Sequence, residues 1–217
     1  MKKIIVISFL ALALPLAALA GDVNFINNGG TLAGSSVGLA LTGSQLTTVV
    51  GLNGNGGVQG DLGTVTFATG ALLSGNLTTG GTFTGAGSSF IITGNGSPGV
   101  PNGVIFSGTF SGALTWVEDT NCGTDGSVCY TLYGSITGIW YTGQTANGAT
   151  VQLTFNAGKN GFTGSVPLAS GDTVIGVVPE PGTLGLLGTG LAALTGLARK
   201  KTIFRKNVAL QPSQHFF

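Results

Sequence analysis

The chain has 217 residues, of which 40 are glycine and 7% are charged, and its formal net charge is +1. The charges are unevenly distributed, because residues 21–178 hold six acidic residues against one base, Lys159, a formal charge of −5. A single lysine without any arginine cannot neutralise a row of phosphates, which excludes nucleic acid as a partner of this region.

The N-terminal segment has the three parts of a secretory signal peptide. Two lysines precede an apolar run from Ile4 to Leu16, and the small-x-small sequence Ala18-Leu19-Ala20 stands before Gly21. This pattern predicts export by the Sec pathway and cleavage by signal peptidase between Ala20 and Gly21. We therefore expect residues 1–20 to be removed, and residues 21–177 to form one exported domain.

The exported domain is interrupted by glycine or Asn-Gly every several residues, and no part of it sustains helical periodicity. Short strands separated by turn signals predict an all-β class, with an antiparallel β-sandwich or a barrel-like architecture. The expected strands are Gln45–Val50, Gly63–Ala68, Gly81–Thr84, Ser88–Thr93, Val104–Val117, Val128–Tyr141, Ala149–Asn156, Gly161–Val166 and Thr173–Val178.

The two longest expected strands show the clearest two-residue alternation, which is typical of a half-buried strand. Their predicted core residues are Phe106, Phe110, Leu114 and Trp116 on the first strand, and Tyr130, Leu132, Ile136 and Trp140 on the second. Asn147-Gly148 then predicts a tight hairpin turn into a strand that carries Val151, Leu153 and Phe155.

Glycines alternate with aromatic residues around Phe106 and Phe110. We favour the interpretation that these glycines let a curved sheet coil and leave room for neighbouring rings. The alternative is a ligand groove in which glycine allows a sugar to approach the backbone closely.

Cys122 and Cys129 are the only cysteines, and a disulfide is their natural assignment in a secreted chain. A regular hairpin that paired them directly would set an apolar face against a polar one. We therefore expect a bulge or an irregular loop between Asp119 and Tyr130. Metal ligation or a redox pair is disfavoured, because CxxC spacing and a partner histidine are missing.

The same loop holds the densest acidity of the chain, in Glu118, Asp119, Asn121 and Asp125. Oxygen ligands ahead of a glycine faintly resemble a calcium loop, but the acidic residue that would close such a loop is missing. A solvated hairpin tip is the favoured interpretation, and we expect no metal and no cofactor.

Catalytic residues are scarce in the exported domain. The only histidine, His215, lies beyond it, so a Ser-His or Cys-His arrangement is not available there. Glu118 and Asp119 are neighbours whose side chains would point to opposite faces of a strand and could not flank one glycosidic bond. We expect a protein without enzymatic activity. The sequence leaves open that Asp61 or Asp172 lies close to Glu118 in the folded chain, which would form the carboxylate pair of a hydrolase.

Three further surface patterns carry hypotheses. Two sequons, Asn76-Leu77-Thr78 and Asn95-Gly96-Ser97, allow glycosylation. Exposed aromatic residues such as Tyr133 and Tyr141 would serve a carbohydrate-binding or adhesive module. Thr64-Val65-Thr66 and Thr82-Phe83-Thr84 resemble the units of flat ice-binding faces, but they have no fixed repeat period.

The C-terminal segment has the features of a short membrane span. Residues 182–198 contain no charge, and a helix of that length rises about 26 Å, slightly less than a hydrocarbon core of about 30 Å. The basic cluster Arg199, Lys200 and Lys201 follows, so the positive-inside rule places residues 202–217 in the cytoplasm as a tail. Span and charge alone also fit an ordinary transmembrane anchor.

Pro179, Glu180 and Pro181, followed by the apolar span and the basic cluster, resemble the PEP-CTERM sorting signal of Gram-negative bacteria. The resemblance covers residues 178–201. In that family an exosortase, a membrane-embedded cysteine transpeptidase, recognises the signal, and the passenger is released to the surface or the exopolysaccharide matrix. The same signal is sometimes labelled an ice-binding protein C-terminal domain.

The resemblance implies an exosortase substrate that passes through an inner-membrane-anchored intermediate before it reaches the cell surface or the medium. Residues 102–110 and 149–154 are also similar to Gly/Thr-rich passengers found with this signal, which have no known activity. We expect a non-enzymatic structural protein associated with the extracellular polysaccharide matrix. A carbohydrate-binding or adhesive module, an ice-binding protein and a C-terminally anchored envelope protein are the alternatives.

Overall fold

The alternation of apolar and polar residues turns one face of each strand toward a common core. The structure is a computed structural model, and it describes residues 22–119 and 126–176, all of which belong to one compact unit. Its strands are β1 (Asp22–Asn28), β2 (Thr31–Ser35), β3 (Gly38–Val50), β4 (Val58–Ala68), β5 (Leu72–Asn76), β6 (Gly80–Phe83), β7 (Ser89–Asn95), β8 (Asn102–Phe110), β9 (Leu114–Asp119), β10 (Cys129–Trp140), β11 (Thr145–Asn156) and β12 (Ser165–Gly176). Two 3-10 helices, η1 (Leu52–Gly54) and η2 (Gly158–Asn160), lie in connections.

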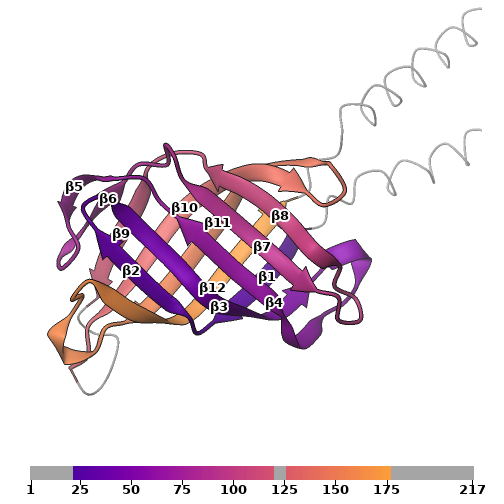
Figure 1. The fold of residues 1–217 in the computed structure, drawn as a ribbon, viewed down its shortest axis with the longest axis horizontal. Helices are drawn as coiled ribbons and strands as arrows, with labels where there is room; N and C mark the ends of the chain where they lie inside the picture. The colour runs from indigo at the N-terminus through magenta and orange to yellow at the C-terminus, as the bar shows by residue number, and fades with distance from the viewer. Residues whose placement is uncertain (1–21, 120–125, 177–217) are drawn as a thin grey trace, which may run out of the picture. The chain divides into compact units, whose positions relative to one another are not determined.

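Eight strands close into an antiparallel barrel, as Figure 1 shows. Around the barrel the order is β1, β12, β11, β10, β8, β7, β4 and β3, and β3 pairs again with β1. Four shorter strands extend this wall: β2 pairs with β12 and β3, β9 pairs with β10 and β6, and β5 pairs with β6. The predicted all-β class is confirmed, and of the two predicted architectures the barrel is the one observed.

Side chains fill the interior of the barrel, as is usual for eight strands. Every core residue predicted on the two longest strands is buried, with an exposed fraction of at most 4%. The aromatic residues form two groups. We call Phe25, Phe67, Phe90, Phe106, Phe110 and Trp140 the Trp140 cluster, and Trp116, Tyr130, Phe155 and Phe162 the Trp116 cluster.

The Trp116 cluster is tied to the backbone around it by hydrogen bonds. The rings of Trp116 and Tyr130 stack with their centroids 4.7 Å apart and an interplanar angle of 2°. Trp116 Nε1 donates to the carbonyl of Leu77 (3.0 Å), and the Tyr130 hydroxyl donates to the carbonyl of Thr78 (2.7 Å). The same hydroxyl accepts from the amide of Phe162 (3.1 Å). These bonds hold the β5–β6 turn and the segment before β12 against the end of the core.

Glycines make room for the rings of the Trp140 cluster. Gly108 and Gly138 are direct partners on β8 and β10. A Cβ atom on Gly138 would lie 2.6 Å from Cζ of Phe106 and would also collide with the carbonyl oxygen of Ser107. The Phe106 ring therefore occupies space that a side chain would need, which agrees with the packing interpretation of the glycine and aromatic alternation.

The predicted strand Val104–Val117 is wrong in one respect, because it consists of two strands. β8 ends at Phe110 and β9 begins at Leu114, and they pair with different halves of β10. The break at residues 111–113 lets β9 leave the line of β8, while Phe106 and Phe110 of β8 and Leu114 and Trp116 of β9 all remain buried.

The hairpin turn predicted at Asn147-Gly148 is also wrong, since both residues lie within β11. The turn comes earlier, where the amide of Gly143, with φ of 86°, donates to the carbonyl of Trp140. Ile136 opposes Ala149 and Gly138 opposes Ala146, so two residues of β11 face one of β10 as in a β-bulge.

The ends of the exported domain also differ from the prediction. The expected strands Gly161–Val166 and Thr173–Val178 are replaced by the single strand β12, which bridges the residues between them. Three observed strands, β1, β2 and β5, were not predicted, because glycine, asparagine and serine lower their strand propensity.

Candidate functional site

The segments that direct export lie outside the described residues. These are the signal peptide with its predicted cleavage site Ala20–Gly21, the motif Pro179, Glu180 and Pro181, and the basic cluster Arg199, Lys200 and Lys201. The expected span 182–198 and the tail 202–217 lie outside them too. Within residues 22–119 and 126–176 there is no helix with the length and hydropathy that a membrane crossing requires.

The predicted disulfide stays a prediction, because Cys122 lies outside the described residues. β9 and β10 keep a regular register up to their ends, where Cys129 opposes Asp119 and Tyr130 opposes Glu118. The expected irregular loop between Asp119 and Tyr130 contains residues 120–125, which lie outside the described residues, so it also stays a prediction. Asn121 and Asp125 of the suggested calcium loop are not described, and the described residues hold no group of three potential metal ligands.

The acidic residues of the described part do not converge. Glu118 opposes the inward-facing Tyr130, whereas Asp172 opposes the exposed Gln152, so the two carboxylates belong to opposite faces of the barrel wall. Asp61 accepts a hydrogen bond at its carbonyl from Asn95, at the far end of the barrel from Glu118. Neither Asp61 nor Asp172 forms with Glu118 the carboxylate pair that a glycosidase uses, in which the groups lie about 5–10 Å apart.

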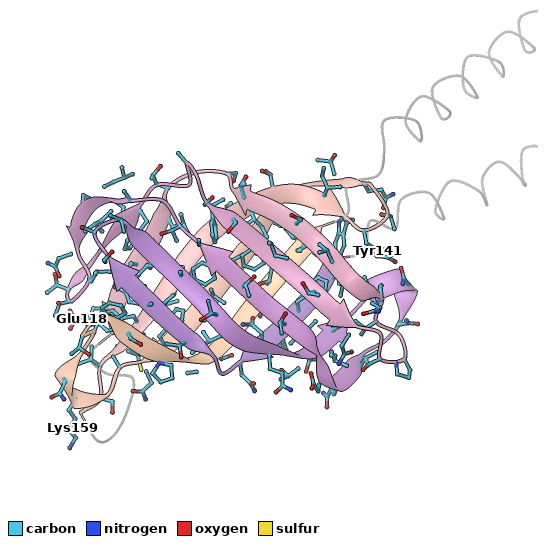
Figure 2. All side chains as sticks on the ribbon, viewed as in Figure 1. Glu118, Tyr141 and Lys159 are labelled. Atoms are coloured by element: carbon cyan, nitrogen blue, oxygen red, sulfur yellow. The ribbon has the colours of Figure 1, made fainter. Side chains whose placement is uncertain are left out.

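The two tyrosines suggested as an aromatic platform lie far apart. Tyr133 is within β10, while Tyr141 follows its last residue, a separation of about 26 Å along an extended strand. Figure 2 shows Tyr141 at the end of the barrel opposite to Glu118 and Lys159. The Tyr141 hydroxyl donates to Oδ1 of Asn53 (2.6 Å), so it is already engaged.

An open groove of about 430 Å³ crosses the outer face of β9, β10, β11 and β12. We call it the outer groove. It is lined by Ala113, Thr115, Tyr133, Gly134, Ser135, Thr150, Val151, Gln152, Asp172 and Val174.

Two rows of side chains build the outer groove. Thr115, Tyr133, Gln152 and Asp172 are successive cross-strand partners, and so are Ser135, Thr150 and Val174. Residues directly opposite in antiparallel strands share a face and lie about 5 Å apart at Cβ, so each row forms a continuous line across the strands. The first row carries the large polar side chains, and the second row carries small ones.

The polar groups of the first row are available to a ligand. Tyr133 has an exposed fraction of 44%, and Gln152 and Asp172 are exposed. Among the described residues, none of these three side chains has a hydrogen-bond partner. An aromatic ring, an amide and a carboxylate therefore line one groove with their polar atoms unoccupied.

Of these groove residues, the sequence singled out only Tyr133 as a candidate for binding. The alternation of apolar and polar residues could place Gln152 and Asp172 on the outer face of their strands. It could not predict the pairing register of β10, β11 and β12, which aligns both residues with Tyr133. That register depends on the bulges in β10–β11 and β11–β12, which add or remove one position.

The two threonine units lie on strands that are not neighbours. Thr64 and Thr66 belong to β4, which pairs with β3 and β7, whereas Thr82 belongs to β6, which pairs with β5 and β9. They do not form the single flat array that an ice-binding face would require.

The sequon asparagines organise turns. Asn76 Oδ1 accepts from the amides of Thr78 (2.8 Å) and Thr79 (2.7 Å). Asn95 Oδ1 accepts from the hydroxyl of Ser97 (2.8 Å), and its Nδ2 donates to the carbonyl of Asp61 (2.9 Å). The spacing of each sequon thus corresponds to a local asparagine turn.

The C-terminal segment identifies the class of protein. Residues 177–201 match the PEP-CTERM protein-sorting motif, so this is a secreted or surface protein that is sorted by a C-terminal signal. The chain carries a PEP-CTERM sorting signal, and the motif implies handling by the export machinery and an exosortase. No curated protein and no solved structure matches the chain.

Proposed function

We propose that the barrel is a non-enzymatic structural component of the extracellular polysaccharide matrix, which exosortase processing delivers to the cell surface or the medium. The observation that carries this proposal is the sorting motif at residues 177–201, which directs the chain outward. The domain that is delivered has a filled interior, and its exposed side chains include many threonines and serines but few charges.

The distribution of side chains supports a structural role. Buried aromatic and aliphatic residues occupy the barrel interior, where a binding cavity would otherwise lie. The acidic residues are spread over both faces and both ends of the wall, as described above. Exposed threonine, serine and asparagine side chains offer many hydrogen bonds to a hydrated neutral polymer without attracting counterions.

Fractionation of the producing cells tests this proposal. The extracellular polysaccharide is precipitated, and the protein is quantified by immunoblot in the polysaccharide, the cleared medium and the membrane fractions. We expect the wild-type protein in the polysaccharide fraction. A Glu180→Ala variant should shift to the membrane fraction because its sorting motif is broken, whereas Glu118→Ala should behave like the wild type.

Two results would contradict the proposal. Wild-type protein that stays entirely in the membrane fraction would indicate a C-terminally anchored envelope protein. Protein that remains in the cleared medium after the polysaccharide is removed would indicate a secreted protein without matrix association.

A further inference from the structure

We infer that the outer groove binds a neutral polysaccharide, with Tyr133 as the surface on which a sugar ring stacks and with Gln152 and Asp172 as hydrogen-bonding partners. This inference rests on the proposed function, since it names the site through which the barrel would contact the matrix. Its evidence is independent of the sorting motif and comes from the geometry of β9–β12.

The hollow has a structural cause in the break between β8 and β9. β8 pairs with β10 from Ile136 onward, and β9 pairs with it only up to Tyr133. Between these ladders the chain bends, and the amide of Ser111 reaches the carbonyl of Ser135 (2.8 Å). The side chains at and beside this bend are small, so the outer surface is recessed next to the bulky Tyr133 side chain.

The chemistry of the groove matches a polyhydroxylated ligand. The face of the tyrosine ring carries partial negative charge, which attracts the weakly positive C–H groups on the face of a sugar ring. The Gln152 amide both donates and accepts, the Asp172 carboxylate accepts, and the hydroxyls of Thr115 and Thr150 do either. Because each sugar hydroxyl also donates and accepts, these groups can all be satisfied by one saccharide.

The charge of the groove favours a neutral polymer over an acidic one. Asp172 is the only charged residue that lines it, and the lining includes no lysine or arginine. A uronic acid or a phosphate would meet a like charge without a compensating cation. The one basic residue of the described part, Lys159, lies at the Glu118 end of the barrel (Figure 2).

Recognition of an extended peptide by strand addition is disfavoured at this position. Each strand under the groove is paired on both sides within the described fold. β9 pairs with β6 and β10, β10 with β8, β9 and β11, β11 with β10 and β12, and β12 with β11, β1 and β2. With no free backbone edge, the ligand must be recognised by side chains.

The line of groove residues continues beyond both ends, which suits a polymer rather than a free sugar. Thr115 opposes Thr82 on β6, and Thr82 opposes Ser74 on β5, with the two hydroxyls 2.7 Å apart. In the other direction Asp172 opposes Ile26 on β1. A chain that leaves the groove toward β6 can therefore contact the hydroxyl groups of Thr82 and Ser74.

The test measures retardation of the purified mature protein in native gels. The gels contain either the neutral or the acidic fraction of the cells' own polysaccharide, separated by anion exchange. We expect retardation by the neutral fraction, at least a tenfold loss of affinity in Tyr133→Ala, and near wild-type affinity in Tyr133→Phe, which keeps the ring. Tyr141→Ala is the matched control, because it removes an exposed tyrosine outside the groove.

The outcomes separate this inference from the proposed function. Wild-type affinity in Tyr133→Ala, absence of retardation by the neutral fraction, or stronger retardation by the acidic fraction would each overturn the groove assignment. If Tyr133→Ala still fractionates with the matrix in cells, the proposed function stands and the groove assignment falls. If the wild type binds the neutral fraction through Tyr133 but stays out of the matrix in cells, the groove stands and the proposed function falls.

Discussion

The two aromatic clusters of the barrel use similar residues but differ in how their polar atoms are satisfied. In the Trp116 cluster the indole N–H and the Tyr130 hydroxyl are both hydrogen-bonded to backbone groups. In and beside the Trp140 cluster, Trp140 Nε1 and Thr173 Oγ1 have no partner among the described residues. The Trp116 cluster is therefore held by directed hydrogen bonds as well as packing, whereas the Trp140 cluster depends on ring contacts and carries the desolvation cost of unpartnered polar atoms.

The largest expected loss of stability comes from removing the Tyr130 hydroxyl, which forms two hydrogen bonds to the backbone around the Trp116 cluster. Tyr130→Phe leaves the carbonyl of Thr78 and the amide of Phe162 without their partner, and should lower the free energy of unfolding by about 2–3 kcal/mol. Urea unfolding followed by fluorescence measures it. Tyr141→Phe, at an exposed position, should cost less than about 1 kcal/mol, and equal losses in the two variants would contradict this account.

Replacing each tryptophan compares the clusters directly. Trp116→Phe and Trp140→Phe remove similar volume, but only the first breaks an observed hydrogen bond. We expect Trp116→Phe to cost about 1–2 kcal/mol more than Trp140→Phe. The chain has two tryptophans, so each variant keeps one, and its fluorescence reports the other end of the barrel. A larger loss in Trp140→Phe would reverse the comparison.

A smaller effect of opposite sign is expected at Thr173, which is fully buried and opposes Phe25. Thr173→Val replaces an unpartnered hydroxyl by a methyl group of similar shape, and should stabilise the protein by up to about 1 kcal/mol. The matched control is Thr69→Val. Thr69 Oγ1 accepts from the amide of Leu39 and donates to the carbonyl of Gly70, so its loss should destabilise the protein in the same urea experiment. Destabilisation by both variants would show that Thr173 does have a partner.

The smallest change in stability is expected for a substitution on the outer face of β10, the strand that carries both Tyr130 and Trp140. Tyr133→Ala should change the free energy of unfolding by less than about 0.5 kcal/mol, because Tyr133 is half exposed and forms no hydrogen bond among the described residues. Thermal unfolding monitored by circular dichroism checks this value. A loss of several kcal/mol would mean that Tyr133 supports the fold.

The sequence predicted the inward-facing residues of β8, β9 and β10 because large apolar side chains recur at alternate positions there, even though Ile105 and Cys129 are also buried beside them. It could not predict the bend at residues 111–113 or the bulge at Asn147-Gly148, since both depend on which strands meet across the barrel. β1 shows the same limit: Val23, Phe25 and Asn27 alternate as buried residues, but the asparagine masks the pattern. The outer groove was partly predictable, in that Tyr133 was a candidate, while its neighbours became evident only from the register.

Delivery of this barrel outside the cell by its sorting signal is tested by the intact mass of the protein recovered from native cells and medium. We predict a mature chain that begins at Gly21 and ends near Pro179 or Pro181, lighter by two hydrogen atoms than the reduced form if Cys122 and Cys129 are bonded. Recovery from the membrane fraction alone, with the chain intact through Phe217, would contradict the claim and indicate a permanently anchored protein.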